Sequence, residues 1–524
     1  MNDGNSTIDS RIYSQIHGEK CWPTVDKISP CEEACPIHMD VPSYIVAISQ
    51  GKFKEAMDVA RLTNPFPYIC GTLCHHPCED VCSRAMVDKP VAIRDIKRFV
   101  ASYGHQNGMA VEPIKQTKEE KVAIIGSGPA GLTAAYDLIK QGFGVSVFEA
   151  LPVAGGMCAA GVPDFKLPAK PVELEVDYVR SLGVDIKTNM RIGTDLSMDD
   201  LRSQGYSSIL IATGAWKNAE LPIPGTDLKK VEQALPFLKK VKLGEKIRLK
   251  GTVCVVGGGN TALDAARTAI RLGASKVVMS CLESREEMPS FEYEIVKAEE
   301  EGVEIMNRVA PQEITSSPAG AARNINFKKV ASFTKADDGK ISWTLEEGAD
   351  ADVSFKVSTV LIAIGQKVDN SFIEKIGLEP NGAFQVDPNS FATTIPGLFA
   401  AGDAVAYPGT IVEAMAAGRR AAQSIASSLD GTELPEPAEK LLRETIVLDD
   451  EEVPVFLARK DRWQMPSVSP KDAVRSFGQR EIGYADWQVM EEAKRCLNCR
   501  MCGNCVFGRA QICFETSNRL IALK

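Results

Sequence analysis

Two copies of a strand–glycine turn–helix unit constrain this chain more than any other feature. The first runs Lys121-Val-Ala-Ile-Ile-Gly126-Ser-Gly128-Pro-Ala-Gly131 and continues through a helical stretch to a strand at residues 145–149. The second runs Thr252-Val-Cys-Val-Val-Gly257-Gly-Gly259-Asn-Thr-Ala262 and continues to a strand at residues 276–280. The glycines of such a unit make a tight turn that admits a pyrophosphate, whose charge the helix N-terminus stabilises. The doubled pattern predicts two dinucleotide-binding domains rather than two tight turns without a ligand.

Glu149 ends the second strand of the first unit. An acidic residue in this position typically accepts a hydrogen bond from a ribose hydroxyl of the dinucleotide. We therefore expect Glu149 to bind the adenosine ribose.

Composition and charge exclude several other classes of protein. The 524 residues predict several domains, and 44% hydrophobic with 25% charged residues is ordinary for globular proteins. The net charge of −9 provides no basic stripe for nucleic acid. The start of the chain lacks a signal-peptide pattern, and no apolar run is long enough to span a bilayer. We expect a cytoplasmic protein without membrane insertion.

The fifteen cysteines are mostly grouped near the two ends of the chain. The groups are Cys21, Cys31, Cys35, Cys70, Cys74, Cys78 and Cys82, and then Cys496, Cys499, Cys502, Cys505 and Cys513. In a reducing compartment, thiolates at such short spacing favour metal binding over disulfides, and soft sulfur ligands select iron–sulfur clusters or zinc. The C-terminal Cys-x-x-Cys steps are typical of ferredoxin loops. Iron–sulfur clusters are the expectation, with zinc or free thiols as the alternatives.

The other cysteines, Cys158, Cys254 and Cys281, are expected to pack in the core. Because no Cys-x-x-Cys lies near either glycine turn, the sequence argues against a dithiol relay. Around the N-terminal cysteines we expect short helices, one capped by Asp40 and another over residues 54–62. His75 and His76 fall among the cysteines, where a solvated or supporting role is favoured over ligation.

Residues 25–430 resemble a known family, the small subunit of NAD(P)H-dependent glutamate synthase and its relatives. The resemblance is carried by an ordered set of motifs: Cys31-Glu-Glu-Ala-Cys35-Pro, Asn64-Pro-Phe-Pro, Cys70-Gly-Thr-Leu-Cys74-His-His-Pro-Cys78-Glu-Asp-Val-Cys82, Pro90-Val-Ala-Ile, Gly155-Gly-Met, Gly161-Val-Pro-Asp-Phe-Lys-Leu-Pro168, Gly257-Gly-Gly-Asn-Thr-Ala-Leu-Asp264, Arg285-Glu-Glu-Met-Pro289 and Ala400-Ala-Gly402-Asp403.

The resemblance implies that the first unit binds FAD and that the second, inserted into it, binds the nicotinamide cofactor. The residues implied for FAD are Gly126, Gly128, Pro129, Ala130, Gly131, Glu149, Gly156, Met157, Thr213, Gly214, Gly402, Asp403, Thr410 and Ile411. Those implied for NAD(P) are Gly257, Gly259, Asn260, Thr261, Ala262, Glu283, Ser284, Arg285 and Gly365. No catalytic acid, base or nucleophile is expected, because flavin itself mediates between a hydride donor and one-electron carriers.

The chain departs from the family in two places. Relatives carry a Cys-x-x-Cys shortly before the Cys-x-x-x-Cys-Pro, whereas only Cys21 stands upstream here. The resemblance therefore implies one N-terminal [4Fe–4S] cluster. A second would raise the requirement to eight thiolates where the N-terminal region has seven, and Cys70 or a non-cysteine ligand would have to fill the gap. NADP-using relatives also place arginines where this chain has Leu282 and Glu283, which favours NAD(H), with NADP(H) as the alternative.

The sequence thus predicts an α/β fold with two Rossmann-like domains, as in glutathione-reductase-like flavoproteins, a helical N-terminal iron–sulfur domain and a ferredoxin-like C-terminal tail. The expected boundaries are residues 1–115 for the N-terminal iron–sulfur domain, residues 116–248 and 363–430 for the FAD domain, residues 249–362 for the NAD(P) domain, and residues 431–524 for the linker and C-terminal tail.

The expected function is that of an electron-transfer subunit with two or three [4Fe–4S] clusters. Its partners would be redox subunits, such as an aldehyde or formate oxidoreductase, a hydrogenase or a bifurcating transhydrogenase, or else ferredoxin. The C-terminal cluster would serve transfer at the subunit contact, or act as a metal staple. The alternatives are the glutamate synthase small subunit, which requires a separate large subunit, and a non-catalytic scaffold.

Overall fold

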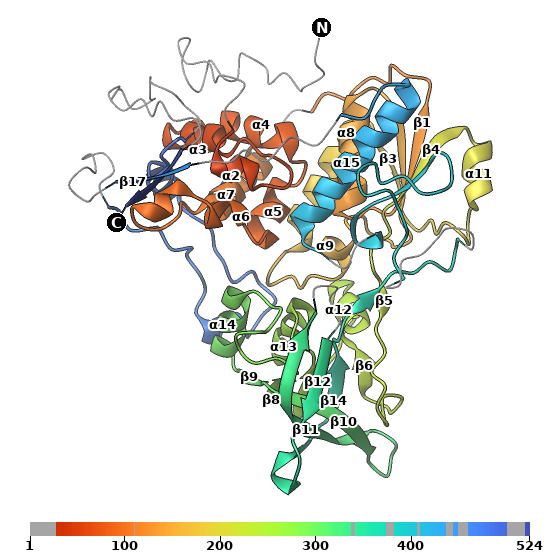
Figure 1. The fold of residues 1–524 in the computed structure, drawn as a ribbon, viewed down its shortest axis with the longest axis vertical. Coiled ribbons are helices and arrows are strands. Elements are labelled where there is room, and N and C mark those ends of the chain that lie inside the picture. The colour runs from red at the N-terminus through yellow and green to blue at the C-terminus, as the bar shows by residue number, and fades with distance from the viewer. Residues whose placement is uncertain are drawn as a thin grey trace.

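The computed structural model describes residues 28–108, 111–336, 341–373, 382–405, 409–435 and 459–499, together with the backbone of two short strands, β17 (Glu444–Leu448) and β18 (Arg519–Leu523). Its parts are a helical N-terminal domain, two α/β domains and a C-terminal segment that crosses between them (Figure 1). None of the described helices is both long and apolar enough to cross a membrane.

The N-terminal domain consists of short helices around the cysteine motifs. They are α2 (Pro30–Glu33), α3 (Val41–Ser49), α4 (Phe53–Thr63), α5 (Pro67–Leu73), α6 (Pro77–Asp80), η1 (Ser83–Met86) and α7 (Ile93–Asn107). Asp40 caps α3, its carboxylate accepting a hydrogen bond from the Ser43 amide at 3.2 Å. The predicted helix after Asp40 and the one over residues 54–62 are confirmed.

The first α/β domain is built on a five-stranded parallel sheet in the order β16-β4-β1-β2-β3. Its elements are β1 (Lys121–Ile125), α8 (Pro129–Lys140), β2 (Gly144–Phe148), α9 (Met157–Ala160), α10 (Ala169–Ser181), β3 (Asp185–Lys187), α11 (Met198–Ser203) and β4 (Tyr206–Ile211), and then β16 (Leu398–Ala400), η3 (Gly402–Ala404) and α15 (Ile411–Asp430). The inner strands β1 and β4 are buried along most of their length because helices cover the sheet. Helices α8 and α15 pack closely, since a Cβ on Gly418 would lie 2.1 Å from the Ala130 carbonyl oxygen.

The second α/β domain is inserted between β4 and β16 and has its own parallel sheet, in the order β6-β14-β7-β8-β9. Its elements are β6 (Val231–Gln233), α12 (Ala234–Lys242), β7 (Thr252–Val256), α13 (Asn260–Arg271), β8 (Lys276–Ser280), α14 (Glu292–Glu300), β9 (Val303–Met306) and β14 (Thr359–Ile362). An antiparallel sheet of β10 (Val309–Ser316), β11 (Ala322–Lys335), β12 (Ile341–Leu345) and β13 (Asp352–Lys356), with η2 (Ala349–Ala351), follows β9. The strand β6 precedes residue 249 and nevertheless pairs with β14 in this sheet.

The connection between the two α/β domains is a two-stranded antiparallel ribbon of β5 (Lys217–Asn218) and β15 (Gln366–Lys367). The chain leaves the first domain through β5 and returns through β15. This arrangement confirms the predicted insertion of the second unit into the first.

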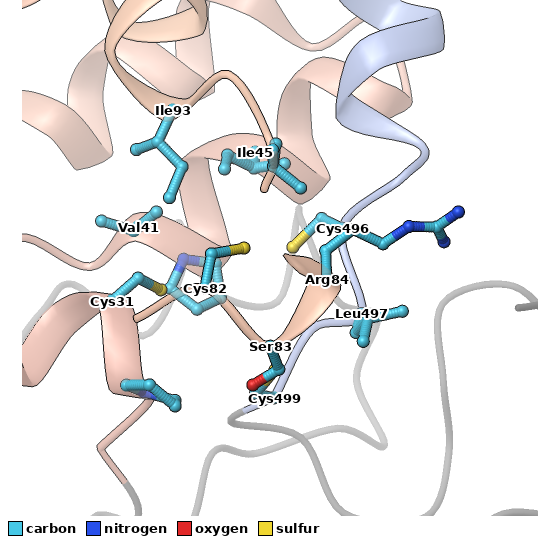
Figure 2. Close-up of a pocket in the computed structure, with 13 residues that line it drawn as sticks. Cys31, Val41, Ile45, Cys82, Ser83, Arg84, Ile93, Cys496, Leu497 and Cys499 are labelled. Carbon is cyan, nitrogen blue, oxygen red and sulfur yellow. The ribbon is translucent and has the colours of Figure 1, made fainter. Parts of the chain in front are cut away.

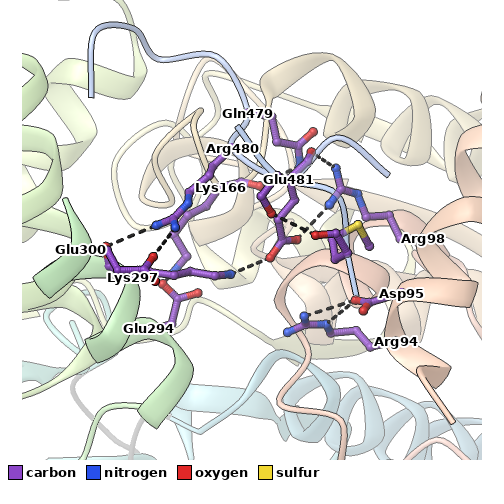
Figure 3. Close-up of polar contacts among 12 residues, drawn as sticks. Arg94, Asp95, Arg98, Lys166, Glu294, Lys297, Glu300, Gln479, Arg480 and Glu481 are labelled. Carbon is purple, nitrogen blue, oxygen red and sulfur yellow. Dashed lines mark hydrogen bonds and ion pairs between the residues drawn. The ribbon is translucent and has the colours of Figure 1, made fainter. Parts of the chain in front are cut away.

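Residues 459–499, which we call the C-terminal strap, contain α16 (Pro470–Ala473) and α17 (Asp486–Ala493). Figure 3 shows the strap joining the second α/β domain to the helical domain. Glu481 accepts hydrogen bonds from Lys297 of α14 at 2.5 Å and from Arg98 of α7 at 2.9 Å. Next to it, Arg480 forms ion pairs with Glu300 and Glu301. The strap therefore fixes the helical domain against the nucleotide-binding part of the chain.

Candidate cofactor and cluster sites

The first glycine turn lies at the carboxyl end of β1, between the strand and α8. Gly126 has φ of +107°, and a Cβ there would lie 2.4 Å from the Ala212 carbonyl oxygen, so only glycine fits. A Cβ on Gly128 would meet nothing within 4 Å, so this side of the turn is open. The residues Pro129, Ala130 and Gly131 begin α8, whose N-terminus points its amides toward that open side.

Glu149 is held against this turn. Its carboxylate accepts hydrogen bonds from the Ser127 amide at 3.0 Å, the Ser127 hydroxyl at 2.6 Å and the Leu151 amide at 2.8 Å. Ser127, which the sequence reasoning did not single out, thus orients the acid expected to contact a ribose. The position of Ser127 inside the glycine motif is the sequence feature that could have identified this role.

The other residues implied for FAD come from segments that end at the same edge of the sheet. Thr213 and Gly214 follow β4, and Gly402 and Asp403 form η3 after β16. The buried Thr213 hydroxyl has no hydrogen-bond partner among the described residues, which fits a site for a polar ligand. Burial raises the pKa of Asp403 to about 6, although the hydrogen bond donated by the Gly409 amide acts to lower it.

Two further segments complete this cradle. A Cβ on Gly156, which precedes Met157 at the start of α9, would lie 2.6 Å from the Gly128 Cα. Thr410 caps α15 in a reciprocal pair with Glu413, so Ile411 begins the helix. The open Gly128 and the unpartnered Thr213 hydroxyl together fit the pyrophosphate and polar groups of a flavin dinucleotide.

The second glycine turn repeats the geometry of the first. Gly257 has φ of +141°, and a Cβ there would lie 2.2 Å from the Ala363 carbonyl oxygen. A Cβ on Gly259 would meet nothing within 4 Å. The residues Asn260, Thr261 and Ala262 form the first turn of α13, and Gly365 follows β14 with φ of +127°. This turn fits a second dinucleotide.

Glu283 follows β8 and lies against the second turn. A Cβ on Gly258 would be 2.9 Å from one Glu283 carboxylate oxygen, so that carboxylate is directed at the turn rather than away from it. Burial raises the pKa of Glu283 above its usual range. The neighbouring amide of Ser284 donates a hydrogen bond to Glu287 at 3.0 Å.

Arg285 is held away from the turn by acidic partners. Its guanidinium donates to Glu292 at 2.7 and 3.0 Å and to Glu299 at 3.3 Å. An arginine engaged with two carboxylates of α14 is not aimed at a cofactor phosphate. The arrangement places an acid, and not a guanidinium, beside the glycine turn.

The cysteines of the N-terminal domain separate into two sets. The first, which we call the inner site, consists of Cys35, Cys70, Cys74 and Cys78, all buried. Burial raises the pKa of Cys78 well above its usual range, and the neighbouring thiols of Cys35 and Cys74 raise it further. Cys70 also lies 3.4 Å, sulfur to sulfur, from Met415 of α15. The inner site therefore adjoins the first α/β domain.

Lys97 of α7 is buried beside the inner site, and the sequence reasoning missed it. Burial acts to lower the pKa of Lys97, but interactions with the thiols of Cys74, Cys70, Cys78 and Cys35 outweigh it and raise the pKa. A lysine among the buried positions of a helix was the only available signal.

The second set consists of Cys31, Cys82, Cys496 and Cys499, which line one cavity (Figure 2). We call it the outer site. The cysteines of the two ends of the chain, expected in separate groups, therefore meet here. Cys21, Cys502, Cys505 and Cys513 lie outside the described residues. Cys158, Cys254 and Cys281 are buried in the α/β domains, as predicted.

Comparisons with known proteins agree with this arrangement. Residues 120–418 match the family described as pyridine nucleotide-disulphide oxidoreductase. Residues 15–109 match dihydropyrimidine dehydrogenase domain II, 4Fe-4S cluster. The fold is similar to that of Mycobacterium tuberculosis FprA, solved in complex with NADPH, with a TM-score of 0.52, 16% identity, and coverage of 60% of this chain and 85% of that one.

The chain belongs to the pyridine nucleotide-disulphide oxidoreductase family. Within it, the chain is 37% identical to the NADP(+)-dependent formate dehydrogenase subunit beta of Moorella thermoacetica, over 91% of this chain and 71% of that protein. It is 32% identical to the NADPH-Fe(3+) oxidoreductase subunit beta of Geobacter sulfurreducens, over 91% and 76%. It is 31% identical to the glutamate synthase [NADPH] small chain of Azospirillum brasilense, over 79% and 90%.

The predicted class is therefore confirmed. The chain is an NAD(P)H-dependent flavin and iron–sulfur oxidoreductase, an electron-transfer subunit related to the glutamate synthase small chain.

Proposed function

We propose that this oxidoreductase works with NADH in preference to NADPH and exchanges electrons with a partner subunit through the inner and outer sites. Bound flavin supplies the exchange between a hydride and single electrons. The residues of the chain supply the placement: the two glycine turns hold the dinucleotides, and the N-terminal domain presents its cysteines to the first α/β domain.

The observation that carries the transfer route is the contact between the inner site and the first α/β domain. Cys70 touches Met415 of α15, the helix that begins beside the residues implied for FAD. On the neighbouring face, the Glu175 carboxylate of α10 accepts hydrogen bonds from the Tyr68 and Ile69 amides at the start of α5, at 2.6 and 3.0 Å. These contacts fix the cysteine-bearing helix α5 against the domain that holds the flavin, which favours transfer between them.

The preference for NADH is argued from Glu283 and Arg285. Glu283 faces the second glycine turn, where a carboxylate accepts a hydrogen bond from a ribose 2′-hydroxyl and repels a 2′-phosphate. Arg285 is engaged by Glu292 and Glu299. A charge-assisted hydrogen bond contributes roughly 1.5–3 kcal/mol, or about 10- to 150-fold in favour of NADH. The Moorella and Geobacter relatives are named for NADP(H), so this chain is proposed to differ from them.

The partner is proposed to be a second redox subunit. The relatives named above include a beta subunit of formate dehydrogenase and a small chain of glutamate synthase. We propose as partner a formate or aldehyde oxidoreductase, a hydrogenase or a bifurcating enzyme. A glutamate synthase large subunit is the second candidate. We propose that the described residues bind two [4Fe–4S] clusters. A third cluster, bound by cysteines outside the described residues, stays an expectation from the sequence.

The test is steady-state reduction of a one-electron viologen dye by the anaerobically purified chain. We expect kcat/KM for NADH to exceed that for NADPH by at least about 10-fold, and no glutamate to form from glutamine and 2-oxoglutarate. Equal or better kcat/KM with NADPH would refute the cofactor assignment. Failure to reduce any dye at full flavin and iron content would refute electron transfer and favour a scaffold.

A further inference from the structure

The outer site joins three segments that are far apart in the sequence. Cys31 lies on α2, Cys82 immediately precedes η1, and Cys496 and Cys499 follow α17 in the C-terminal strap. Together they line a cavity with an empty volume of about 350 Å³, including its opening to solvent. Figure 2 shows the sulfur atoms of Cys31, Cys82 and Cys496 directed into this space. The remainder of the lining is largely apolar, with Val41, Ile45 and Ile93 among its side chains.

The C-terminal cysteines are held in this position by a buried polar network. Arg495, with a side chain 1% exposed, donates hydrogen bonds to Asp88 at 2.7 Å and to Glu492 at 2.6 Å. Glu492 also accepts from the Ala92 amide at 2.9 Å, so α17 is tied to the start of α7. Cys499 contacts the Ser83 hydroxyl at 3.5 Å. The residue before Cys496 and the Cys499 thiol are therefore both anchored to the segment that carries Cys82.

We propose that Cys31, Cys82, Cys496 and Cys499 together hold one [4Fe–4S] cluster, so that the C-terminal Cys-x-x-Cys completes a site begun by the N-terminal domain. Four thiolates are the usual ligand set of such a cluster, each bound to a different iron. The described part of the N-terminal domain contributes two thiols to this cavity, those of Cys31 and Cys82, and the strap supplies the other two from the other end of the chain.

The geometry of the thiols is that of a shell around a cavity. A cluster of four irons needs its thiolates at the periphery. Zinc is the alternative metal for such cysteines, and the metal content measured below distinguishes it from an iron–sulfur cluster.

The two sites are then arranged in series. Cys31 belongs to the outer site, and Cys35, four residues later, belongs to the inner site. Likewise Cys78 belongs to the inner site and Cys82 to the outer site. The inner cysteines are buried beside α15, whereas Cys499 is exposed. The cluster completed by the strap is therefore the one nearer the surface, where a partner subunit would receive electrons.

The test counts iron and acid-labile sulfide in the anaerobically purified full-length chain. The variant Cys496→Ala/Cys499→Ala should lose about four irons and four sulfides per chain, together with one cluster signal in electron paramagnetic resonance, while flavin content stays unchanged. The matched control Cys502→Ala/Cys505→Ala should keep that same cluster signal, and any iron it loses would belong to the expected third cluster. Because this inference rests on the proposed iron–sulfur function but not on nucleotide choice, metal content separates its failure from that of the NADH assignment.

Combining Cys31→Ala with Cys496→Ala/Cys499→Ala gives the sharpest comparison. If the three residues bind one cluster, the combined variant should lose the same four irons as either parent, not eight. An additive loss, an unchanged iron content in the C-terminal variant, or one zinc per wild-type chain would overturn the proposal.

A second measurement does not depend on how well the variants fold. In the wild-type protein, Cys31, Cys82, Cys496 and Cys499 should be protected from alkylation together and should become reactive together when the cluster is destroyed by oxidation. Alkylation of Cys496 and Cys499 while Cys31 stays protected would also overturn the proposal.

Discussion

Asp88 accepts a 2.7 Å hydrogen bond from Arg495 and also pairs with Arg84, so one carboxylate joins the loop after η1 to the residue before Cys496. Burial raises the pKa of Asp88, but the hydrogen bonds from Arg84, from the Lys460 and Lys89 amides and from Arg495 outweigh it and hold the pKa well below its usual range. Both guanidinium groups are almost fully buried, and removing Asp88 takes a carboxylate from each of them and leaves Arg495 with Glu492. Asp88 thus helps to fix the segment that carries the C-terminal cysteines.

We expect Asp88→Asn to destabilise the strap by about 3–5 kcal/mol, the usual cost of breaking a buried ion pair. The protein should show a lower Tm and faster proteolysis within residues 459–499. The control Asp199→Asn removes a carboxylate 90% exposed on α11, paired with a surface arginine, and should change neither the Tm nor the proteolysis. Unchanged proteolysis in Asp88→Asn would show that the strap is held elsewhere.

The cofactor preference should be reversible at two positions. Replacing Leu282 and Glu283 with arginine removes the carboxylate that faces the second glycine turn and supplies guanidinium groups that bind a 2′-phosphate. The ratio of kcat/KM for NADH over NADPH should fall by at least about 10-fold, mainly through KM. Glu304→Arg reverses the charge of an exposed residue of β9, which is two of the three charge units of the double replacement, and should leave the ratio near that of the wild type. A similar change in both variants would mean that only net charge matters.

The NADH preference should also weaken as pH falls. Burial raises the pKa of Glu283, so the carboxyl gains its proton at a higher pH than an exposed glutamate does and then no longer repels a phosphate. The 2′-phosphate itself titrates near about pH 6. We therefore compare the wild type with Glu283→Gln between about pH 8 and about pH 6. The wild-type selectivity should change more steeply; parallel curves would assign the whole effect to the phosphate.

The sequence was sufficient where local pattern determines structure. Gly126 and Gly257 need positive φ and have no room for a side chain, so the motif itself specifies both turns. It was not sufficient where distant segments meet. The spacing of Cys496 and Cys499 indicates a shared metal site, but it is contacts between distant residues, such as the ion pairs of Arg495 and Glu481, that place that pair beside Cys31. Ion pairs between residues that are far apart in the sequence leave no periodic pattern in it, so the sequence could not predict them.

Ending the chain after Arg495 should separate flavin chemistry from electron transfer to the partner. The truncation removes Cys496 and everything after it but retains Arg495 and its buried hydrogen bonds. Reduction of a viologen dye by NADH should remain largely intact, because both glycine turns and the inner site are untouched. Transfer to the natural partner should be abolished. An undiminished transfer rate in the truncated complex would make the tail a structural staple.

The last prediction concerns Lys97, whose ammonium is buried beside the four inner thiols. A nearby positive charge stabilises the more negative, reduced form of a cluster and so raises its reduction potential. Lys97→Met keeps the length of the side chain but removes the charge, and the inner cluster should become harder to reduce. If the lost interaction is worth roughly 1.5–3 kcal/mol, the potential should fall by about 60–130 mV for a one-electron couple. A redox titration followed by electron paramagnetic resonance measures it, with Lys97→Arg as the control that keeps the charge. Equal potentials in Lys97→Met and the wild type, at equal iron content, would show that the ammonium does not act on the cluster.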